Sequence, residues 1–389
     1  MTLVETEELR ELRAVLRRFL AEHAPVAAAR RLMATRDGLD RELWRRMAGE
    51  LGLQGLAVPA EHGGSGFGVR ELAVVFEEMG RVLYCGPFLA TVGLALPALL
   101  AAGAEAGDLQ GIADGSSIAT LAWTEDGRWT APPAMTCENG VLSGTKTYVL
   151  DGHTADLILV AARSGDGSTA LFAVDGDAGG LTRTPLPTLD QTRKLARLDF
   201  ADVPARLVAA DADAALARAR DVAATLLAAE QVGGAERALE MTVEYVKVRE
   251  QFGRPIGSFQ AVKHRCADMF VQVESARSAM LNAASAADDA PAGASDGASD
   301  GASDGASGEL PVAAALAKAF CSDAYFHVAG ETIQLHGGIG FTWEHDAHLY
   351  FKRAKASQEL FGPPAAHRDR LAGLVGITAD GVRGAATAP

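Results

Sequence analysis

Residues 249–260 read Arg-Glu-Gln-Phe-Gly-Arg-Pro-Ile-Gly-Ser-Phe-Gln, and they join two long helical patterns. A nearly unbroken run of helix formers, 214–249, precedes them, and a second helical pattern begins at Ser258, a residue suited to the N-cap position. Because Gly-x-Pro-x-Gly interrupts a helix, we predict a helix hairpin with Arg249 and Gln260 on adjacent helix ends. An arginine there can clamp a diphosphate with its planar fork, or it can simply stabilise the helix C-terminus.

Outward from the hairpin, the hydrophobic pattern divides the chain into three parts. Residues 1–116 show the spacing of amphipathic helices, residues 117–210 show short alternating runs, and residues 211–376 return to long helical patterns. We therefore predict an α+β protein with an N-terminal helical domain, a middle β-barrel or β-sandwich domain and a C-terminal helical domain. Repeated Gly-Ala-Ser units predict a flexible loop at 293–308, and residues 377–389 are predicted to form a disordered tail.

The composition excludes several functions. The 389 residues are 48% hydrophobic and 22% charged, which allows large cores and argues against general disorder. The net charge of −14 argues against nucleic-acid binding, although a few arginines can still hold a phosphate.

The four cysteines form no CxxC pair, so we expect buried thiols in a reducing cytoplasm and no metal site. The first twenty residues mix Glu and Arg, unlike a signal peptide, and Gly and Pro interrupt the uncharged stretch 82–104, which favours a core helix over a membrane span.

Two stretches closely resemble the acyl-CoA dehydrogenases. Residues 229–269 run from Ala-Glu-Gln-Val-Gly-Gly-Ala-Glu-Arg-Ala-Leu through the hairpin to Gln-Ala-Val-Lys-His-Arg-Cys-Ala-Asp-Met, and residues 334–342 read Gln-Leu-His-Gly-Gly-Ile-Gly-Phe-Thr. The Gly-Gly-Ser-Gly loop at 63–66 and the helix–β–helix order match as well. The resemblance covers nearly the whole chain, and it extends to subunits of heteromeric actinobacterial enzymes that degrade sterol side chains. It implies a C-terminal four-helix bundle and FAD-dependent α,β-dehydrogenation of acyl-CoA thioesters.

The resemblance also implies how FAD is held. In this family each FAD lies at a dimer interface: the β domain of one subunit holds the flavin ring, and the C-terminal helices of its neighbour hold the ADP half. Six positions match that ADP clamp, and all six carry the family's residue types: Arg249, Phe252, Gln260, Gln334, Gly337 and Gly338.

The ring-binding half departs from the family pattern. The family's Thr-Glu-Pro and the Gly-rich Ser-Asp segment after it are replaced by Thr-Glu-Asp-Gly-Arg at 124–128, so that Thr124 remains a candidate cofactor contact. The next strand usually supplies a Trp and a Thr near the flavin N5, but here Tyr148 and Leu150 occupy those places. Leucine cannot donate the hydrogen bond that helps to bind and polarise N5.

The catalytic base is the largest departure. Removal of the weakly acidic α-proton requires a carboxylate, and the family's usual Glu position is occupied here by Phe361. The alternative Glu position on the long helix corresponds to Ala223. Glu230 lies on the same helix face, roughly 10 Å further along the axis, and is either a displaced base or a buried structural carboxylate. Glu359 is two residues from the usual position, and we expect it to face elsewhere.

Three interpretations follow from these patterns. The chain is a subunit of a heteromeric acyl-CoA dehydrogenase, such as an α2β2 assembly, that lends its ADP clamp to a partner's flavin. Alternatively, it is a homo-oligomeric dehydrogenase with a displaced base such as Glu230, or a non-enzymatic protein that binds CoA esters or flavin.

Overall fold

The structure is a computed structural model whose described residues are 6–129, 131–165, 167–290 and 306–377. The predicted loop 293–308 lies outside them except at its end, and the predicted tail lies outside them beyond residue 377. The last residues of that predicted loop are helical instead, because α9 (Ala306–His336) already begins there. Glu309 lies in the first turn of α9, where a carboxylate favours helix formation.

The N-terminal domain is helical. It consists of α1 (Glu7–His23), α2 (Val26–Met33), α3 (Arg41–Leu51), η1 (Ala60–His62), α4 (Val69–Arg81), the π-helix η2 (Leu89–Ala95), α5 (Leu96–Ala102) and α6 (Ala106–Ala113). The Asp40 carboxylate caps α3 by accepting hydrogen bonds from the N–H groups of Glu42 and Leu43 at 3.0 Å. The uncharged stretch 82–104 forms the buried η2 and α5, as predicted for a core helix. Among the described residues, no helix combines the length and hydrophobicity needed to cross a membrane.

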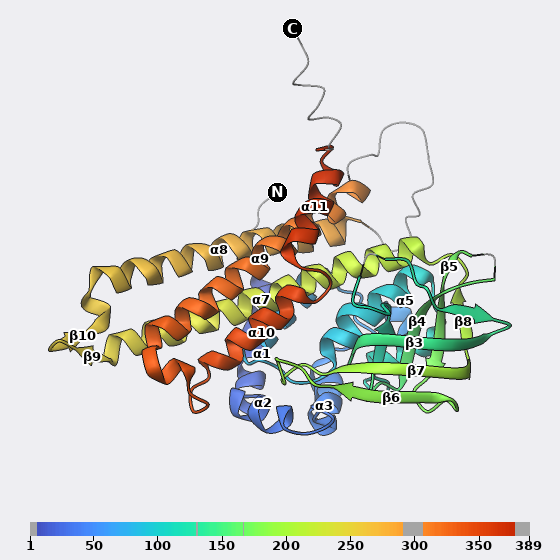
Figure 1. Ribbon diagram of the computed structural model, residues 1–389, viewed down its shortest axis with the longest axis horizontal. Helices are drawn as coiled ribbons and strands as arrows, with labels where there is room; N and C mark the ends of the chain where they lie inside the picture. Colours follow the sequence, from blue (N-terminus) through green and yellow to red (C-terminus); the bar gives the residue numbers. More distant parts are fainter. Residues whose placement is uncertain (1–5, 130, 166, 291–305, 378–389) are drawn as a thin grey trace, which may run out of the picture.

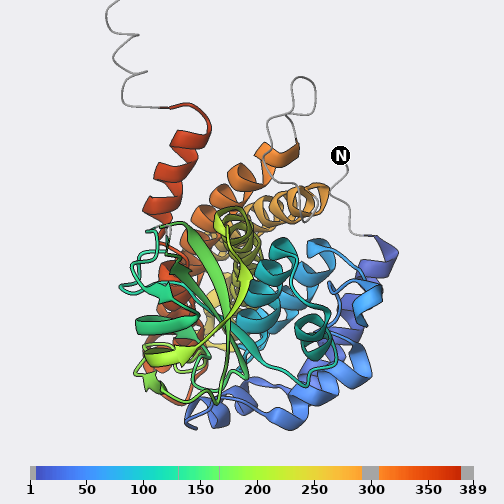
Figure 2. The ribbon, with the colours of Figure 1, turned by 90° about the vertical axis from the view of Figure 1, so that its right-hand side faces the viewer.

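The middle domain is one eight-stranded sheet. Its strands are β1 (Ala119–Ala122), β2 (Thr136–Glu138), β3 (Val141–Leu150), β4 (Leu157–Arg163), β5 (Thr169–Asp175), β6 (Leu181–Leu186), β7 (Leu195–Pro204) and β8 (Arg206–Ala209). The order is β6-β7-β3-β2-β4-β5-β8, and β1 also pairs with β4. The pairs of β4 with β1 and β2 are parallel, and the other pairs are antiparallel. Figure 2 shows the sheet beside the N-terminal helices.

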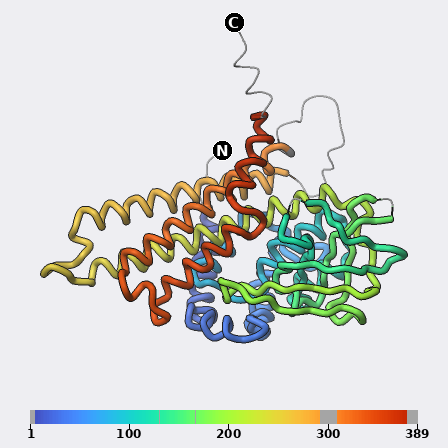
Figure 3. The backbone as a smooth tube through the Cα atoms, in the orientation of Figure 1, coloured from blue at the N-terminus to red at the C-terminus, as the bar shows by residue number. Residues whose placement is uncertain are grey.

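The C-terminal domain consists of long helices that lie side by side (Figures 1 and 3). They are α7 (Asp213–Val248), α8 (Gln260–Asp289), α9, α10 (Ala347–Glu359) and α11 (Pro364–Leu374), with the 3-10 turns η3 (Ile256–Ser258) and η4 (Gly337–Phe341). α7 packs against α4, α8 and α9. Gly233 permits the contact with α4, because a Cβ atom there would lie 1.8 Å from the carbonyl oxygen of Glu77. The predicted order of helical, sheet and helical domains is thus confirmed.

Candidate functional site

The tip of the C-terminal domain carries the first part of the predicted clamp. Arg249 is the C-cap residue of α7, and the short strands β9 (Glu250–Gln251) and β10 (Arg254–Pro255) form a hairpin that leads towards α8. Phe252 and Gly253 have φ angles of 56° and 76°, and positive φ at both central residues is what a tight hairpin turn requires. The turn projects from the molecule (Figure 1), and it leaves the Phe252 side chain 91% exposed.

α8 begins at Gln260, which places this clamp residue on the exposed first turn. The predicted Ser258 cap is wrong: Phe259 occupies the N-cap position, because Ser258 belongs to the preceding 3-10 turn. The Arg254 guanidinium carbon lies 4.1 Å from the centre of the Phe259 ring. Arg254 is therefore engaged within the tip by a cation–π contact.

The second part of the clamp comes from the end of α9. The Tyr245 and His336 rings stack with their centroids 4.4 Å apart, which joins the last turn of α7 to the last turn of α9. Gln334, Gly337 and Gly338 are exposed beside this contact. Gly337 has a φ of 63°, in the left-handed region that favours glycine. The fold therefore brings all six clamp positions to the same end of the helical domain.

The tip offers charged and apolar surface together. In the part of the chain that the structure describes, no hydrogen bond or ion pair engages the Arg249 guanidinium. Large apolar side chains surround the clamp and are exposed: Val248, Ile339, Phe341 and Trp343. Exposed apolar side chains gathered in this way are typical of an interaction surface.

The residues predicted to face the flavin ring lie at the edge of the sheet domain. The Thr124 hydroxyl oxygen accepts hydrogen bonds from the N–H groups of Gly127 at 2.8 Å and Asp126 at 3.3 Å. Its own O–H is what remains to contact a cofactor. Tyr148 has a φ of 53° and lies in a β-bulge between β3 and β7, which turns its ring outwards. Leu150 is buried and has no polar side-chain atom.

A cavity of about 480 Å³ adjoins this edge, between the sheet domain and the end of α10. Its walls include Tyr148, Leu189, Leu195 and Leu360, which are apolar or aromatic, and Glu359. The Glu359 carboxylate forms an ion pair with Lys355 at 2.5 Å. A carboxylate that is paired and exposed to solvent is a weak candidate for a base.

Phe361 is buried, whereas Glu359 is exposed, so the two side chains lie in different surroundings. It is 2% exposed and meets the ring of Trp129 edge-on, with the centroids 5.0 Å apart. Its φ of 61° is unusual for a large side chain, and side-chain hydrogen bonds from other helices help to hold the turn. His367 lies 3.0 Å from the Phe361 carbonyl oxygen through Nε2, and the Lys318 ammonium donates to the Gly362 carbonyl at 3.2 Å. The residue predicted to occupy the family's base position is thus part of an aromatic contact.

Glu230 is part of a buried charge cluster. Arg193 donates from Nη2 to both carboxylate oxygens at 2.6 Å, and Arg353 donates from Nη1 at 2.8 Å. Burial opposes ionisation, but the two guanidinium charges outweigh it and lower the pKa of Glu230 below its ordinary value. A carboxylate held in this way has little tendency to accept a proton, so the geometry favours a structural role over that of a displaced base.

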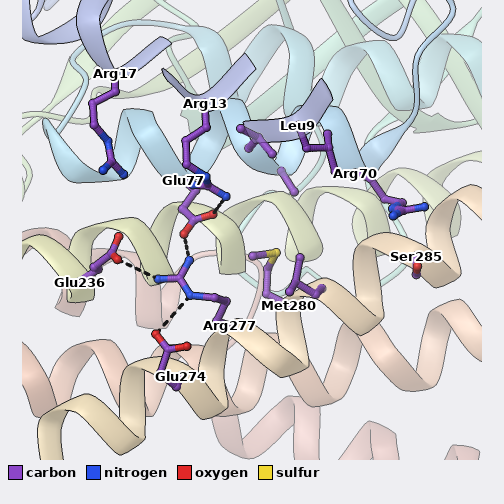
Figure 4. A pocket seen from close by; sticks show the side chains of 13 residues that line it. Leu9, Arg13, Arg17, Arg70, Glu77, Glu236, Glu274, Arg277, Met280 and Ser285 are labelled. Atoms are coloured by element: carbon purple, nitrogen blue, oxygen red, sulfur yellow. Dashed lines mark hydrogen bonds and ion pairs between the residues drawn. The ribbon is translucent and has the colours of Figure 1, made fainter. Parts of the chain in front are cut away.

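A second cavity, of about 400 Å³, lies between α1, α4, α7 and α8 (Figure 4). The Arg277 guanidinium forms ion pairs with Glu77, with Glu236 at 3.1 Å and with Glu274 at 3.4 Å. Arg13 pairs with Glu77 from the other side at 2.9 Å. Because these charges neutralise one another across four helices, we interpret the cluster as structural.

Across the described residues, no group of three or more His, Cys, Asp or Glu side chains is placed to hold a metal ion.

Known proteins are similar to this chain in sequence and fold. Residues 6–108 match the family model for the acyl-CoA dehydrogenase N-terminal domain, and residues 214–375 match the model for the C-terminal domain. Acyl-CoA dehydrogenase IpdE2 of Mycobacterium tuberculosis is 38% identical over 92% of this chain and 94% of its own length. The chain belongs to the acyl-CoA dehydrogenase family. This family consists of FAD-dependent oxidoreductases that act on CH–CH donors.

Two solved structures of the family are similar over almost the whole chain. A variant of the Tcur3481–Tcur3483 steroid ACAD is 35% identical, with a TM-score of 0.82 over 98% of this chain and 99% of that one. The ChsE4–ChsE5 complex of Mycobacterium tuberculosis is 29% identical, with a TM-score of 0.84 over 97% of this chain and 100% of that one.

The two halves of an FAD site fit this acyl-CoA dehydrogenase chain unequally. The clamp residues suit the ADP half: the Arg249 fork is exposed, and a Cβ atom at Gly337 or Gly338 would meet nothing within 4 Å, so that a ligand can approach the backbone. The ring side is less suitable, because Leu150 offers no donor and the Thr124 oxygen is engaged in its own turn.

The sequence did not reveal the partners of Glu230 and Phe361. Arg193 and Trp129 lie in segments without periodic structure, so no pattern pointed to them. A signal did exist for Arg353, which follows the buried Tyr350 by three residues and therefore lies on the same helix face.

Proposed function

We propose that this chain is a subunit of a heteromeric acyl-CoA dehydrogenase, and that it holds the ADP half of an FAD whose ring and catalytic base belong to a partner chain. The observation that carries the proposal is a contrast between two parts of this chain, the ADP clamp and the base position. The six clamp residues are complete and exposed at the tip, whereas the base position is filled by Phe361 and packed against Trp129.

The chemistry explains why a partner is required. When bound, FAD accepts the hydride that leaves the β-carbon of the thioester. The α-proton must pass to a carboxylate at the same time, and Phe361 cannot accept it. Glu230 is neutralised by two arginines, and Glu359 is paired with Lys355. We therefore assign this chain the roles of binding and orienting the cofactor, and the partner the role of the base.

The relatives support this division of labour. The Tcur3481–Tcur3483 and ChsE4–ChsE5 structures each combine two differently named chains. We infer a similar assembly here, with two copies of each chain, in which the exposed apolar side chains around the clamp lie at the interface. We place it in the cytoplasm, where reduced cysteines are typical, because all four cysteines are free thiols in the structure.

Arg249→Ala tests the clamp. We expect FAD affinity of the assembled complex to fall about ten- to a hundredfold, because a charge-assisted contact contributes ~1.5–3 kcal/mol. Arg249→Lys should restore part of the affinity, since an ammonium lacks the planar fork. The measurement is the FAD-to-chain ratio and the FAD dissociation constant after co-expression with a family chain that retains Glu at the base position.

Arg254→Ala is the matched control, because Arg254 lies on the same tip but is stacked on Phe259. It should leave FAD affinity nearly unchanged. If Arg249→Ala retains FAD as well as the parent complex, the clamp assignment is wrong. If the chain purified alone is a monomer with one firmly bound FAD, the shared site is wrong.

A further inference from the structure

Two cavities meet at Trp129. The cavity of about 480 Å³ between the sheet domain and the end of α10 has Gly127, Trp129 and Pro363 among its walls. A cavity of about 160 Å³ is lined by the same three residues, and also by Phe361. Trp129 therefore lies where the two cavities adjoin, together with Gly127 and Pro363, and it has the largest side chain of the three.

Aromatic packing fixes the indole in this place. Trp129 is 6% exposed, and its ring meets Phe361 at 5.0 Å and Trp123 at 6.3 Å, both in edge-to-face contacts. Such contacts between desolvated rings stabilise a defined orientation. Trp123 and Trp129 belong to the sheet domain, whereas Phe361 belongs to the turn between α10 and α11, so that the three rings close the space between two domains.

The turn that carries Phe361 is itself held in place. The buried Lys318 ammonium donates hydrogen bonds to the carbonyl groups of Gln358 at 3.1 Å and Gly362 at 3.2 Å. His367 contacts the Phe361 carbonyl oxygen from the next helix. A large residue remains in the left-handed region when its surroundings determine the conformation in this way. The aromatic contact with Trp129 is therefore part of a rigid arrangement.

The smaller cavity carries excess positive charge. Its walls include Arg220 and Arg370, which share the single carboxylate of Asp221: Arg370 binds it in a bidentate manner at 2.5 and 2.7 Å, and Arg220 approaches it at 3.4 Å. Arg128, also in the wall, is paired with Asp126. Two guanidinium groups with one counter-charge suit a phosphate-bearing ligand.

We infer that Trp129, together with Phe361, is a plug that separates the arginine-lined cavity from the larger, mainly apolar cavity and prevents an anionic acyl thioester from occupying both in this chain. The inference rests on the proposed function and deepens it. Besides lacking a base at Phe361, the chain excludes substrate from the space beside that residue. An acyl arm can pass from the arginines to the larger cavity after the indole is removed.

Trp129→Ala in the purified chain tests the plug. The probes are octanoyl-CoA and free CoA, and the measurement is equilibrium dialysis with the stoichiometry per chain. We expect the variant to bind one octanoyl-CoA at least tenfold more tightly than the unmodified chain, with little gain for free CoA, because the acyl arm enters the opened space. Trp129→Phe keeps an aromatic ring in the wall and should remain closed.

Trp129→Leu is the second variant, because it removes the ring while keeping an apolar side chain that supports folding. Each variant is checked by its melting transition. Unchanged octanoyl-CoA binding in folded Trp129→Ala or Trp129→Leu would overturn the plug, and so would octanoyl-CoA binding by the unmodified chain as tight as that of the variants. The plug and the proposed function can fail separately, because loss of FAD on Arg249→Ala is read in the assembled complex and does not depend on acyl-CoA binding.

Discussion

Glu230→Gln removes the negative charge that joins three parts of the fold. Arg193 comes from the loop before β7, Glu230 from the middle of α7, and Arg353 from α10. The three hydrogen bonds are 2.6–2.8 Å long, and all three side chains are buried. After the substitution Arg353 keeps Asp190 at 2.7 Å, whereas Arg193 keeps the Ser357 hydroxyl at 3.1 Å. A buried charge deprived of its partner costs ~3–5 kcal/mol, and we expect a loss of this size in the free energy of unfolding.

The assay is urea unfolding, followed by tryptophan fluorescence and circular dichroism, with comparison of midpoints and m-values. The matched control is Glu274→Gln, which removes the same charge from a side chain that is 46% exposed and pairs with Arg277 at 3.4 Å. That change should cost less than ~1 kcal/mol. Equal losses in the two variants would refute the structural role of Glu230.

The pH dependence of Glu230→Gln gives an independent check. Burial raises the pKa of Glu230, but the charges of Arg193 and Arg353 lower it by more than burial raises it. The folded pKa therefore lies below the ordinary value. The ion pairs then stabilise the fold fully above the unfolded pKa of about 4.3, and this contribution is lost as the pH falls through the lower folded pKa. The difference in stability between the parent chain and the variant should be constant from neutral pH to about pH 5 and shrink below pH ~4. A difference that grows on acidification would contradict the assignment.

Three further changes have expected outcomes. Burial raises the pKa of Asp151 to about 7, so the parent chain should lose stability as the pH rises from about 4 to 7. Asp151→Asn should remove this dependence. In urea unfolding across that window, the variant should gain ~1.4 kcal/mol of stability per pH unit relative to the parent chain. Gly233→Ala should destabilise by ~3 kcal/mol or more by the same measurement, because its Cβ would lie 1.8 Å from the Glu77 carbonyl oxygen, whereas Gly49→Ala has open space and should be neutral or slightly stabilising. Phe361→Glu in the lone chain should not create a dehydrogenase, because the ring pocket lacks its donor; rapid flavin bleaching on anaerobic mixing with acyl-CoA thioesters would contradict this.

The sequence predicted those parts of the molecule that depend on local pattern. Gly-x-Pro-x-Gly indicated the hairpin, and the change from helical to alternating spacing indicated the order of domains. It could not predict which cations meet Glu230, because helix periodicity identifies a buried face and not its distant partners. Arg193 and Arg353 are 37 and 123 residues away from it in the chain. The position of Trp129 was equally hidden, since it lies in a non-periodic loop between β1 and β2 and meets Phe361 through tertiary packing.

The geometry of α7 explains how one half of the site can change without disabling the other. Arg249 and Glu230 lie on the same helix, and nineteen residues at 1.5 Å each separate them by ~28 Å along the axis. The cluster around Glu230 adjoins the cavity beside the sheet domain through Arg193, whereas Arg249 is exposed at the C-terminal end of the helix. Under the proposed function, a cofactor held at the tip would face another chain rather than the flavin-ring residues of this chain. Replacement of the base by Phe361, and closure of the space beside it by Trp129, leave the tip unaltered, and this separation is what makes a clamp-lending subunit physically consistent.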